Sequence, residues 1–166
     1  MELKEKNLID SFWLNKRVLI TGHTGFKGTW LSFWLNLKGA IVNGFSLDLS
    51  DQNIFFSEIF RSNKYSDYSS SNLKNYYGDI RKYTDIEKCI NEVKPEIVFH
   101  LAAQPLVRES YRDPILTWDT NIIGTLNLLE ALKDIDNHCT IIIVTSDKVY
   151  KNKETLDGYQ EIDRLG

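Results

Sequence analysis

Four polar residues that could transfer protons stand in a row near the carboxyl end of the chain. Thr145, Ser146, Asp147 and Lys148 follow an apolar run and supply two hydroxyls, a carboxylate and an amine. Groups of these types, held together at one strand end, can exchange protons with a bound hydroxyl or carbonyl compound. The same four residues would also suit an ordinary polar loop. Whether they form a proton-transfer site or only a loop depends on whether other ligand-binding residues are predicted to lie near them.

A glycine-rich loop near the amino terminus predicts a ligand for that edge. Gly22, Gly25 and Gly28 are spaced as GxxGxxG between an apolar run and a helical pattern, which suits a pyrophosphate at a helix N-terminus. A P-loop is excluded, because GxxxxGK[ST] counted from Gly22 puts Lys27 at the required glycine and Gly28 at the required lysine. His23 and Lys27 suit either a solvated surface or a contact with cofactor phosphate or substrate.

Three acidic residues are candidates for the adenosine half of a dinucleotide. Asp48 follows the second apolar run and is the candidate for the ribose hydroxyls, with Asp51 as the fallback. Asp79 and Ile80 end the third predicted strand, YYGDI, where the carboxylate could reach an adenine amino group. A plain surface turn is the alternative for this last pair.

A third set of candidate ligand-binding residues follows the apolar run EIVFH. Ala102 and Ala103 leave space for a flat ligand close to the sheet edge. Gln104, Arg108 and Tyr111 are predicted to lie in a loop on the ligand side, and an arginine there suits a phosphate or a sugar.

Three other reactive residues are predicted to be structural. His100 ends an apolar strand without another metal ligand nearby, so we expect a core or hydrogen-bonded histidine. Cys89 and Cys139 lie in apolar surroundings without CxxC spacing and are predicted to be small buried hydrophobes rather than a disulfide. No metal site is expected.

The elements that must position these residues alternate between strand and helix patterns. Apolar runs rich in β-branched residues predict strands at Arg17–Thr21, Ala40–Ser46, Glu96–His100 and Thr140–Thr145, besides the YYGDI segment. Apolar residues at helical spacing predict helices at Gly25–Lys38, at Tyr83–Val93 and in a segment that opens at Pro114. In the last segment Ile122, Leu126 and Leu129 share a face, and core burial is the favoured interpretation over a subunit contact.

This alternation predicts an α/β fold with a doubly wound parallel sheet of the Rossmann type, whose ligands bind at the carboxyl ends of the strands. Five strands can be assigned and a usual sixth cannot, so residues 1–166 are expected to form one NAD-binding domain that is incomplete at its C-terminal end. The composition, 42% hydrophobic and 26% charged, is that of a globular protein. The net charge of −3 argues against a nucleic-acid partner, and the lack of a long apolar segment argues against a membrane span. The expected location is the cytoplasm.

Four motifs together resemble the extended short-chain dehydrogenase/reductase superfamily and, within it, the CDP-glucose 4,6-dehydratase family. They are TGHTGFKG at Thr21–Gly28, HLAAQPLVRESY at His100–Tyr111, TNIIGT at Thr120–Thr125 and TSDKVY at Thr145–Tyr150. On this basis the cofactor-binding residues are expected to be Gly22, Thr24, Gly25, Phe26, Lys27, Gly28, Asp48, Asp79, Ile80, Leu101, Ala102, Ala103, Gln104 and Asn121. Gln104, Arg108 and Ser146 are expected to bind substrate.

The resemblance implies NAD-dependent dehydration of CDP-glucose to CDP-4-keto-6-deoxyglucose, a lyase reaction that supplies deoxysugars for lipopolysaccharide O-antigen. Hydride leaves C4 for NAD, water is eliminated across C5 and C6, and the hydride returns to C6. By this likeness Thr145 hydrogen-bonds near the sugar 4-hydroxyl, Asp147 protonates the departing C6 hydroxyl, and Lys148 holds the position of the base that removes the C5 proton. A lysine base must be neutral, which requires a pKa lowered by about three units.

One expected feature of the family is missing from the sequence. The oxidation step uses a Tyr-x-x-x-Lys pair, but Tyr150 is followed four positions later by Glu154, and Tyr159 by Asp163. Full-length members are roughly twice as long, so the chain resembles an amino-terminal half that would not turn over substrate alone.

Several alternatives stay open at this point. A GDP-mannose 4,6-dehydratase or a sugar-nucleotide epimerase would share the fold, although the SDK and AAQPLVR segments favour the CDP-glucose enzymes. A non-catalytic dinucleotide-binding module would need no tyrosine base. Asp48 favours NAD while Lys27 would attract the 2'-phosphate of NADP. The resemblance also implies a homo-oligomer in the full-length protein.

Overall fold

The computed structural model describes residues 11–48, 54–60, 73–146, 148–154 and 156–166. Asp51 and Asp147, two of the candidate site residues, lie outside this part of the chain.

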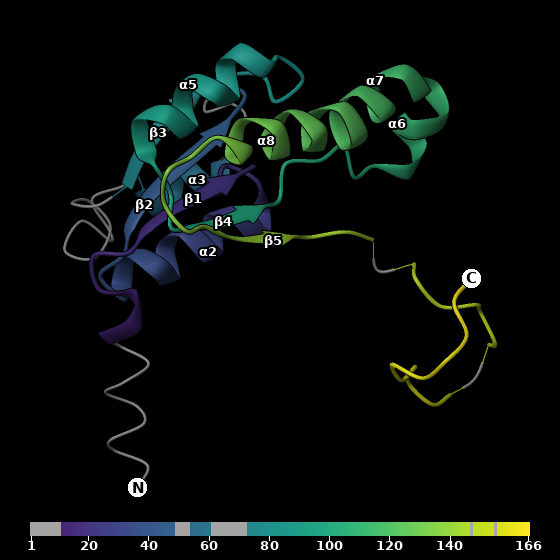
Figure 1. Cartoon of the computed structure of the whole chain (residues 1–166). Helices are drawn as coiled ribbons and strands as arrows, with labels where there is room; N and C mark the ends of the chain where they lie inside the picture. The colour runs from purple at the N-terminus through teal and green to yellow at the C-terminus, as the bar shows by residue number, and fades with distance from the viewer. Residues whose placement is uncertain (1–10, 49–53, 61–72, 147, 155) are drawn as a thin grey trace, which may run out of the picture.

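The described residues form a five-stranded parallel sheet with the strand order β3-β2-β1-β4-β5 (Figure 1). The strands are β1 Arg17–Thr21, β2 Ile41–Ser46, β3 Leu73–Tyr77, β4 Ile97–His100 and β5 Thr140–Ile143. The order reverses between β1 and β4, which are direct neighbours in the sheet. The predicted doubly wound Rossmann arrangement is therefore confirmed, and its switch point lies at the carboxyl ends of β1 and β4.

Helices cover both faces of the sheet, as expected for parallel strands that are buried on both sides. The first helix of the fold, α2 (Phe26–Leu37), packs on β1 and β2 and contacts α3 (Ile54–Phe60). On the opposite face, α5 (Tyr83–Val93) packs against α8 (Gly124–Lys133) (Figure 1). A hydrophobic core lies on each face of the sheet, and alternate residues of β1 point into one core or the other. Leu19 is buried in the core next to α5 and α8, whereas Val18 and Ile20 are buried in the core next to α2.

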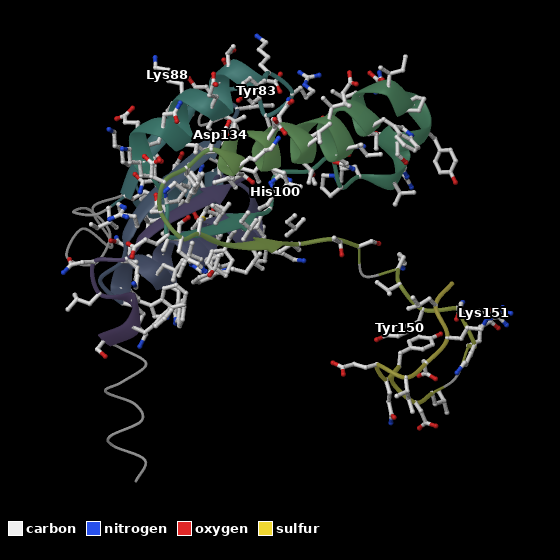
Figure 2. All side chains as sticks on the ribbon, viewed as in Figure 1. Tyr83, Lys88, His100, Asp134, Tyr150 and Lys151 are labelled. Carbon is white, nitrogen blue, oxygen red and sulfur yellow. The ribbon has the colours of Figure 1, made fainter. Side chains whose placement is uncertain are left out.

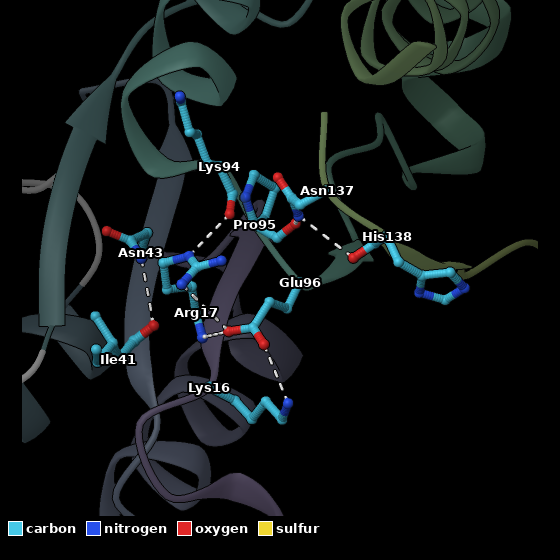
Figure 3. A network of polar contacts seen from close by, with 9 residues as sticks. All are labelled: Lys16, Arg17, Ile41, Asn43, Lys94, Pro95, Glu96, Asn137 and His138. Carbon is cyan, nitrogen blue, oxygen red and sulfur yellow. Dashed lines mark hydrogen bonds and ion pairs between the residues drawn. The ribbon is translucent and has the colours of Figure 1, made fainter. Parts of the chain in front are cut away.

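A polar network fixes the amino ends of β1 and β4, opposite the edge at which ligands are expected (Figure 3). The Glu96 carboxylate accepts hydrogen bonds from the Arg17 backbone N–H at 3.1 Å and from Lys16 Nζ at 3.0 Å. Arg17 Nε donates to the Lys94 carbonyl at 2.9 Å. The backbone bond from Arg17 and the Lys16 ammonium lower the pKa of Glu96, so this carboxylate stays charged while it holds the two strands in register.

Two strands end earlier in the structure than in the prediction. The third strand ends at Tyr77, so the YYGDI assignment is wrong for Asp79 and Ile80, which lie in the loop before α5. The Asp79 N–H donates instead to the Asp85 carboxylate of α5 at 3.0 Å. The fifth strand ends at Ile143 rather than Thr145, because its partner β4 ends at His100 and the last ladder contact is Val144 N–H to the His100 carbonyl.

The segment that opens at Pro114 is helical as predicted, but it contains a change of helix type. It runs as α7 (Pro114–Trp118), a π-helical turn η2 (Asp119–Ile123) and then α8. A short helix, α6 (Val107–Arg112), precedes it, so the predicted loop position of Arg108 and Tyr111 is wrong.

The apolar face of this segment is exposed rather than buried. Ile122, Leu126 and Leu129 are 47%, 56% and 39% exposed, so the prediction of core burial is wrong for all three. Leu128 and Leu132 of α8 fill the core instead. The π turn changes the angular relation between residues on either side of it, which helical spacing in the sequence does not reveal.

Beyond β5 the chain leaves the sheet and forms a separate turn-rich segment (Figure 1). The Tyr150 and Tyr159 rings stack in this segment with centroids 5.2 Å apart. Figure 2 shows Tyr150 and Lys151 well apart from His100, which lies at the end of β4 beneath α8.

Candidate functional site

A cavity of about 570 Å³ lies at the carboxyl edge of the sheet, next to the switch point. Four segments line most of it: the glycine loop after β1, the end of β2, the loop after β3 and the loop after β4. The lining residues are Gly22, Thr24, Gly25, Phe26, Lys27, Gly28, Phe45, Ser46, Leu47, Gly78, Asp79, Ile80, Arg81, Leu101, Ala102, Ala103, Pro105, Leu116, Thr120, Val144 and Thr145. This position is where open α/β sheets bind their ligands.

The glycine loop is packed so closely that side chains at two of its glycines would collide with backbone. Gly22 has φ +72°, and a Cβ there would lie 2.8 Å from the Ala102 backbone N. A Cβ on Gly28 would lie 2.2 Å from the Gly22 carbonyl O. These contacts bring the start of α2 against the loop. Because the first turn of α2 contains no acidic residue, its N-terminal N–H groups suit an anion such as a pyrophosphate.

His23 of the glycine loop does not lie at the surface. Its ring is fully buried, and its Nε2 lies 2.8 Å from Oδ1 of Asn75 on β3. Phe56 of α3 packs against the ring edge to face. Burial lowers the pKa of His23, and the hydrogen bond to Asn75 and the Phe45 backbone offset this only in part. Both sequence interpretations of His23, solvated surface and ligand contact, are therefore wrong, whereas Lys27 is exposed at the cavity.

An ion pair stands at the β3 end of the cavity. Asp79 accepts two hydrogen bonds from Arg81 Nε, at 2.9 and 3.0 Å, and another from Arg81 Nη2. The Arg81 guanidinium lowers the pKa of the Asp79 carboxyl. Arg81 is a lining residue that the sequence analysis missed, although its place two residues after Asp79 in a predicted ligand loop could have indicated it. Asp48 is exposed and lies outside the lining, where Ser46 and Leu47 stand instead.

Close packing of α8 brings the π turn to the cavity. A Cβ on Gly124 would lie 2.7 Å from Cγ2 of Ile80, so only a glycine permits this approach. Thr120 of η2 lines the cavity, while the neighbouring Asn121 pairs with the Gln104 backbone. Asn121 Oδ1 accepts from Gln104 N–H at 2.7 Å, and Asn121 Nδ2 donates to the Gln104 carbonyl at 3.2 Å.

Gln104 and Asn121 hold the wall of the cavity together. The Gln104 side chain accepts from the Leu106 N–H at 2.6 Å and donates to Thr117 Oγ1 at 2.8 Å. Both side chains are thus engaged within the protein, and neither belongs to the cavity lining. The structure connects the loop after β4 to the helices α7 and η2 through these contacts.

The three candidate proton-transfer residues that the structure describes are not gathered at the cavity. Thr145 lines it, whereas Ser146 and Lys148 are exposed and lie outside the lining. Ser146 Oγ accepts from the Lys148 backbone N–H at 2.9 Å. Arg108, on α6, is also exposed and outside the lining. The part of the site assembled in the described residues is therefore the part predicted for a dinucleotide.

Other residue types predicted to be structural lie in structural positions. His100 is buried and hydrogen-bonded, as predicted. Cys89 is buried, which raises the pKa of its thiol to about 12, and Cys139 is partly buried; neither forms a disulfide. Within the described ranges there is no cluster of three or more residues that could bind a metal ion. None of the helices in the part of the chain that the structure describes could span a membrane.

Comparison with known proteins gives consistent matches along nearly the whole chain. Residues 19–161 match the family model of GDP-mannose 4,6 dehydratase. The chain is 48% identical to CDP-glucose 4,6-dehydratase from Salmonella typhimurium over 156 residues, which are 94% of this chain and 41% of that enzyme. It is 36% identical to human GDP-mannose 4,6 dehydratase, over 87% of this chain and 37% of that protein.

A solved structure with the same fold is UDP-glucose 4-epimerase from Bifidobacterium longum in complex with NAD+ and UDP. It matches with a TM-score of 0.72 and 26% identity, over 90% of this chain and 42% of the epimerase. The chain thus spans about two-fifths of the length of the relatives it matches. The sheet order, the cavity at the switch point and the family model agree, and the chain belongs to the GDP-mannose 4,6-dehydratase family of the extended short-chain dehydrogenase/reductase fold.

Proposed function

We propose that this chain supplies the NAD-binding part of an enzyme that dehydrates CDP-glucose to CDP-4-keto-6-deoxyglucose. The observation that carries the proposal is the cavity in which the close-packed glycine loop and the N-terminus of α2 meet the loops after β3 and β4. The 48% identity to the Salmonella enzyme supports CDP-glucose as the substrate, against 36% for human GDP-mannose 4,6 dehydratase.

The residues of the cavity fit a dinucleotide for two reasons. Side chains at Gly22 and Gly28 would collide with backbone, so these glycines keep the loop close to the start of α2, where N–H groups are available to an anion. Asp79, Ile80 and the Arg81 guanidinium form an end that suits a nucleoside. NAD in this cavity would supply a hydride acceptor at C4 of the sugar and a hydride donor at C6.

This chain's own residues would bind and orient the two reactants. The N–H groups of the glycine loop would hold the pyrophosphate, and Asp79 would accept a hydrogen bond from the adenine amino group. Thr145, at the far end of the lining, would hydrogen-bond the sugar near its 4-hydroxyl. We propose that Asp147 protonates the departing C6 hydroxyl and that Lys148 removes the C5 proton, which requires Lys148 to move from its exposed position to the bound sugar.

A chimaera tests the substrate assignment. The 156-residue segment of the Salmonella enzyme that matches this chain is replaced by the corresponding residues of this chain. The chimaera is then assayed with CDP-glucose and with GDP-mannose, and the 4-keto product is followed by its absorbance in base. We expect turnover of CDP-glucose only. A chimaera that binds NAD but turns over GDP-mannose instead would overturn the assignment.

A second candidate function is GDP-mannose dehydration, which the name of the matching family model favours. The same assay distinguishes it, because the two substrates differ in both base and sugar. A non-catalytic dinucleotide-binding module is the remaining alternative: it would bind NAD, yet its chimaera would leave both sugar nucleotides unchanged.

We also propose that the exposed face of η2 and α8 forms a contact between two copies of the protein. Ile122, Leu126 and Leu129 are exposed apolar side chains of these two elements, and exposed apolar patches on proteins mark association sites. Analytical ultracentrifugation should show a dimer that Leu126→Glu dissociates. An unchanged sedimentation coefficient in Leu126→Glu would contradict this contact.

A further inference from the structure

His100 connects three separate parts of the structure beneath the cavity. It lies at the carboxyl end of β4 and is 3% exposed. Its Nδ1 is 2.7 Å from Oγ1 of Thr21, the last residue of β1, and its Nε2 is 2.9 Å from Oγ1 of Thr125 on α8. Each ring nitrogen therefore has a single hydroxyl partner. The other hydrogen bonds of the two hydroxyls determine which atom donates in each pair.

The Thr21 hydroxyl must donate to His100. Its oxygen accepts the backbone N–H of Leu101 at 3.2 Å and that of Ala102 at 3.1 Å. A hydroxyl has two acceptor sites and one hydrogen. With both acceptor sites used, the remaining hydrogen is directed to Nδ1, which must be unprotonated to receive it.

The Thr125 hydroxyl gives the same result from the other side of the ring. Its oxygen lies 2.7 Å from the Asn121 carbonyl, which can only accept, so the Thr125 hydrogen is used in that bond. Thr125 Oγ1 must therefore accept from Nε2, which must carry a hydrogen. Two independent contacts thus assign the same neutral tautomer.

We propose that His100 is a positioning residue, held as the neutral Nε2–H tautomer, that fixes the loop at residues 101–106 and the π turn η2 around the cavity. One end of its hydrogen-bond chain holds the N–H groups of Leu101 and Ala102, both of which follow β4 in the lining. The other end reaches the carbonyl of Asn121, whose side chain holds Gln104. The proposal rests on the proposed function in one respect, that the cavity so shaped binds NAD.

Burial is consistent with this protonation state. It lowers the pKa of His100 to about 4. A proton on Nδ1 would also leave Nδ1–H facing the Thr21 hydroxyl hydrogen, so the chain of bonds would break at Thr21.

Nitrogen NMR of the whole chain, labelled with ¹⁵N-histidine, tests the tautomer directly. The chain has three histidines, and His100→Phe and His138→Gln identify the resonances of two of them. We expect His100 to show an unprotonated Nδ1 and a protonated Nε2 at neutral pH, and to keep this pattern on acidification to about pH 5. A protonated Nδ1 at neutral pH, alone or with Nε2, would overturn the proposal.

Threonine variants test the positioning role through the dissociation constant of NAD. Thr21→Val keeps the side-chain shape but leaves the Ala102 N–H without its acceptor, and Thr125→Val does the same to His100 Nε2–H. We expect each to weaken NAD binding about tenfold, since a buried group without its partner is costly. The matched control Thr140→Val, at the exposed start of β5, should bind NAD as the wild type does.

A structural role alone would lower the stability of Thr21→Val and Thr125→Val without changing NAD affinity in the folded protein, and that result would overturn the positioning role. If the proposed function itself is wrong and the cavity does not bind NAD, the experiments give a different pattern. In that case the wild-type chain does not bind NAD, while the His100 tautomer in the NMR spectrum is still the one assigned here.

Discussion

A Cβ placed on Gly44 would lie 2.2 Å from Cδ2 of His23, so the histidine of the glycine loop occupies the space that a side chain on β2 would need. The His23 ring also lies within hydrogen-bonding distance of Asn75 on β3 and packs against Phe56 on α3. The loop that shapes the cavity is therefore attached to β2, β3 and α3 through one buried side chain.

Gly44→Ala should destabilise the protein strongly. The new methyl group would meet a buried ring that cannot move into solvent, and overpacking of this kind costs about 1 to 3 kcal/mol. Urea denaturation of the wild type and the variant measures the difference in the free energy of unfolding. His23→Ala should itself destabilise the protein, because it empties the same space.

The double variant His23→Ala/Gly44→Ala separates this contact from other effects. Since each substitution relieves the defect of the other, the combined loss should be smaller than the sum of the two single losses by more than about 1 kcal/mol. Strict additivity would mean that the ring and the glycine are not coupled.

Lowering the pH should reduce the free energy of unfolding because of His100, at pH values above those at which the carboxylates of the chain become protonated. The pKa of His100 is lowered to about 4 when folded and is near 6.5 when unfolded, so the unfolded state binds the proton more readily. Stability is then full above about pH 6.5 and falls as the pH decreases toward 4, by about 3 kcal/mol in total.

The measurement is the free energy of unfolding against pH for the wild type and for His100→Asn. His23 has a lowered pKa from the same cause and acts in the same direction, so the comparison of the two proteins isolates His100. The curve of His100→Asn should be shallower between pH 6.5 and 4.5. Parallel curves would show that folding does not lower the pKa of His100.

Asp79→Asn should change the preference between NAD and NADP. In the wild type the Asp79 carboxylate holds the Arg81 guanidinium, and both residues line the cavity. Without the carboxylate charge, Arg81 becomes available to a 2'-phosphate, and the affinity for NADP relative to NAD should rise about tenfold. Calorimetric titrations with the two dinucleotides measure the ratio.

Asp163→Asn is the matched control for this change. Asp163 forms an ion pair with Lys153 at 2.6 Å in the segment beyond β5 and does not line the cavity. Its substitution should leave the NADP to NAD ratio unchanged. An equal ratio in Asp79→Asn and the wild type would contradict a role for Arg81 in cofactor choice.

Local patterns predicted the elements that surround the cavity. The apolar run Arg17–Thr21 and the helix Tyr83–Val93 have the predicted bounds, because continuous apolar runs and helical spacing reflect burial directly. The three glycines of the loop lie where the motif predicts, and a Cβ on Gly22 or on Gly28 would collide with backbone.

Features that depend on contacts distant in sequence could not be predicted. His23 is buried because Gly44 and Asn75, more than twenty and fifty residues away in the sequence, leave a space and a hydrogen-bond partner for it. A regular helical pattern anticipates neither the π turn at Asp119–Ile123 nor the exposure of Leu126 and Leu129 on α8. Gln104 was predicted to contact ligands, but its partners Thr117 and Asn121 are identified only when α7 and η2 are in place.

Titration of the chain with NAD, followed by calorimetry, tests the central claim that the cavity is a dinucleotide site. The wild type should bind one NAD per chain. Gly28→Ala should lose this binding because its Cβ would lie 2.2 Å from the Gly22 carbonyl, whereas Gly158→Ala, with no atom within 4 Å, should bind as the wild type does. Absence of NAD binding to the folded wild type, or equal affinity in Gly28→Ala, would contradict the account.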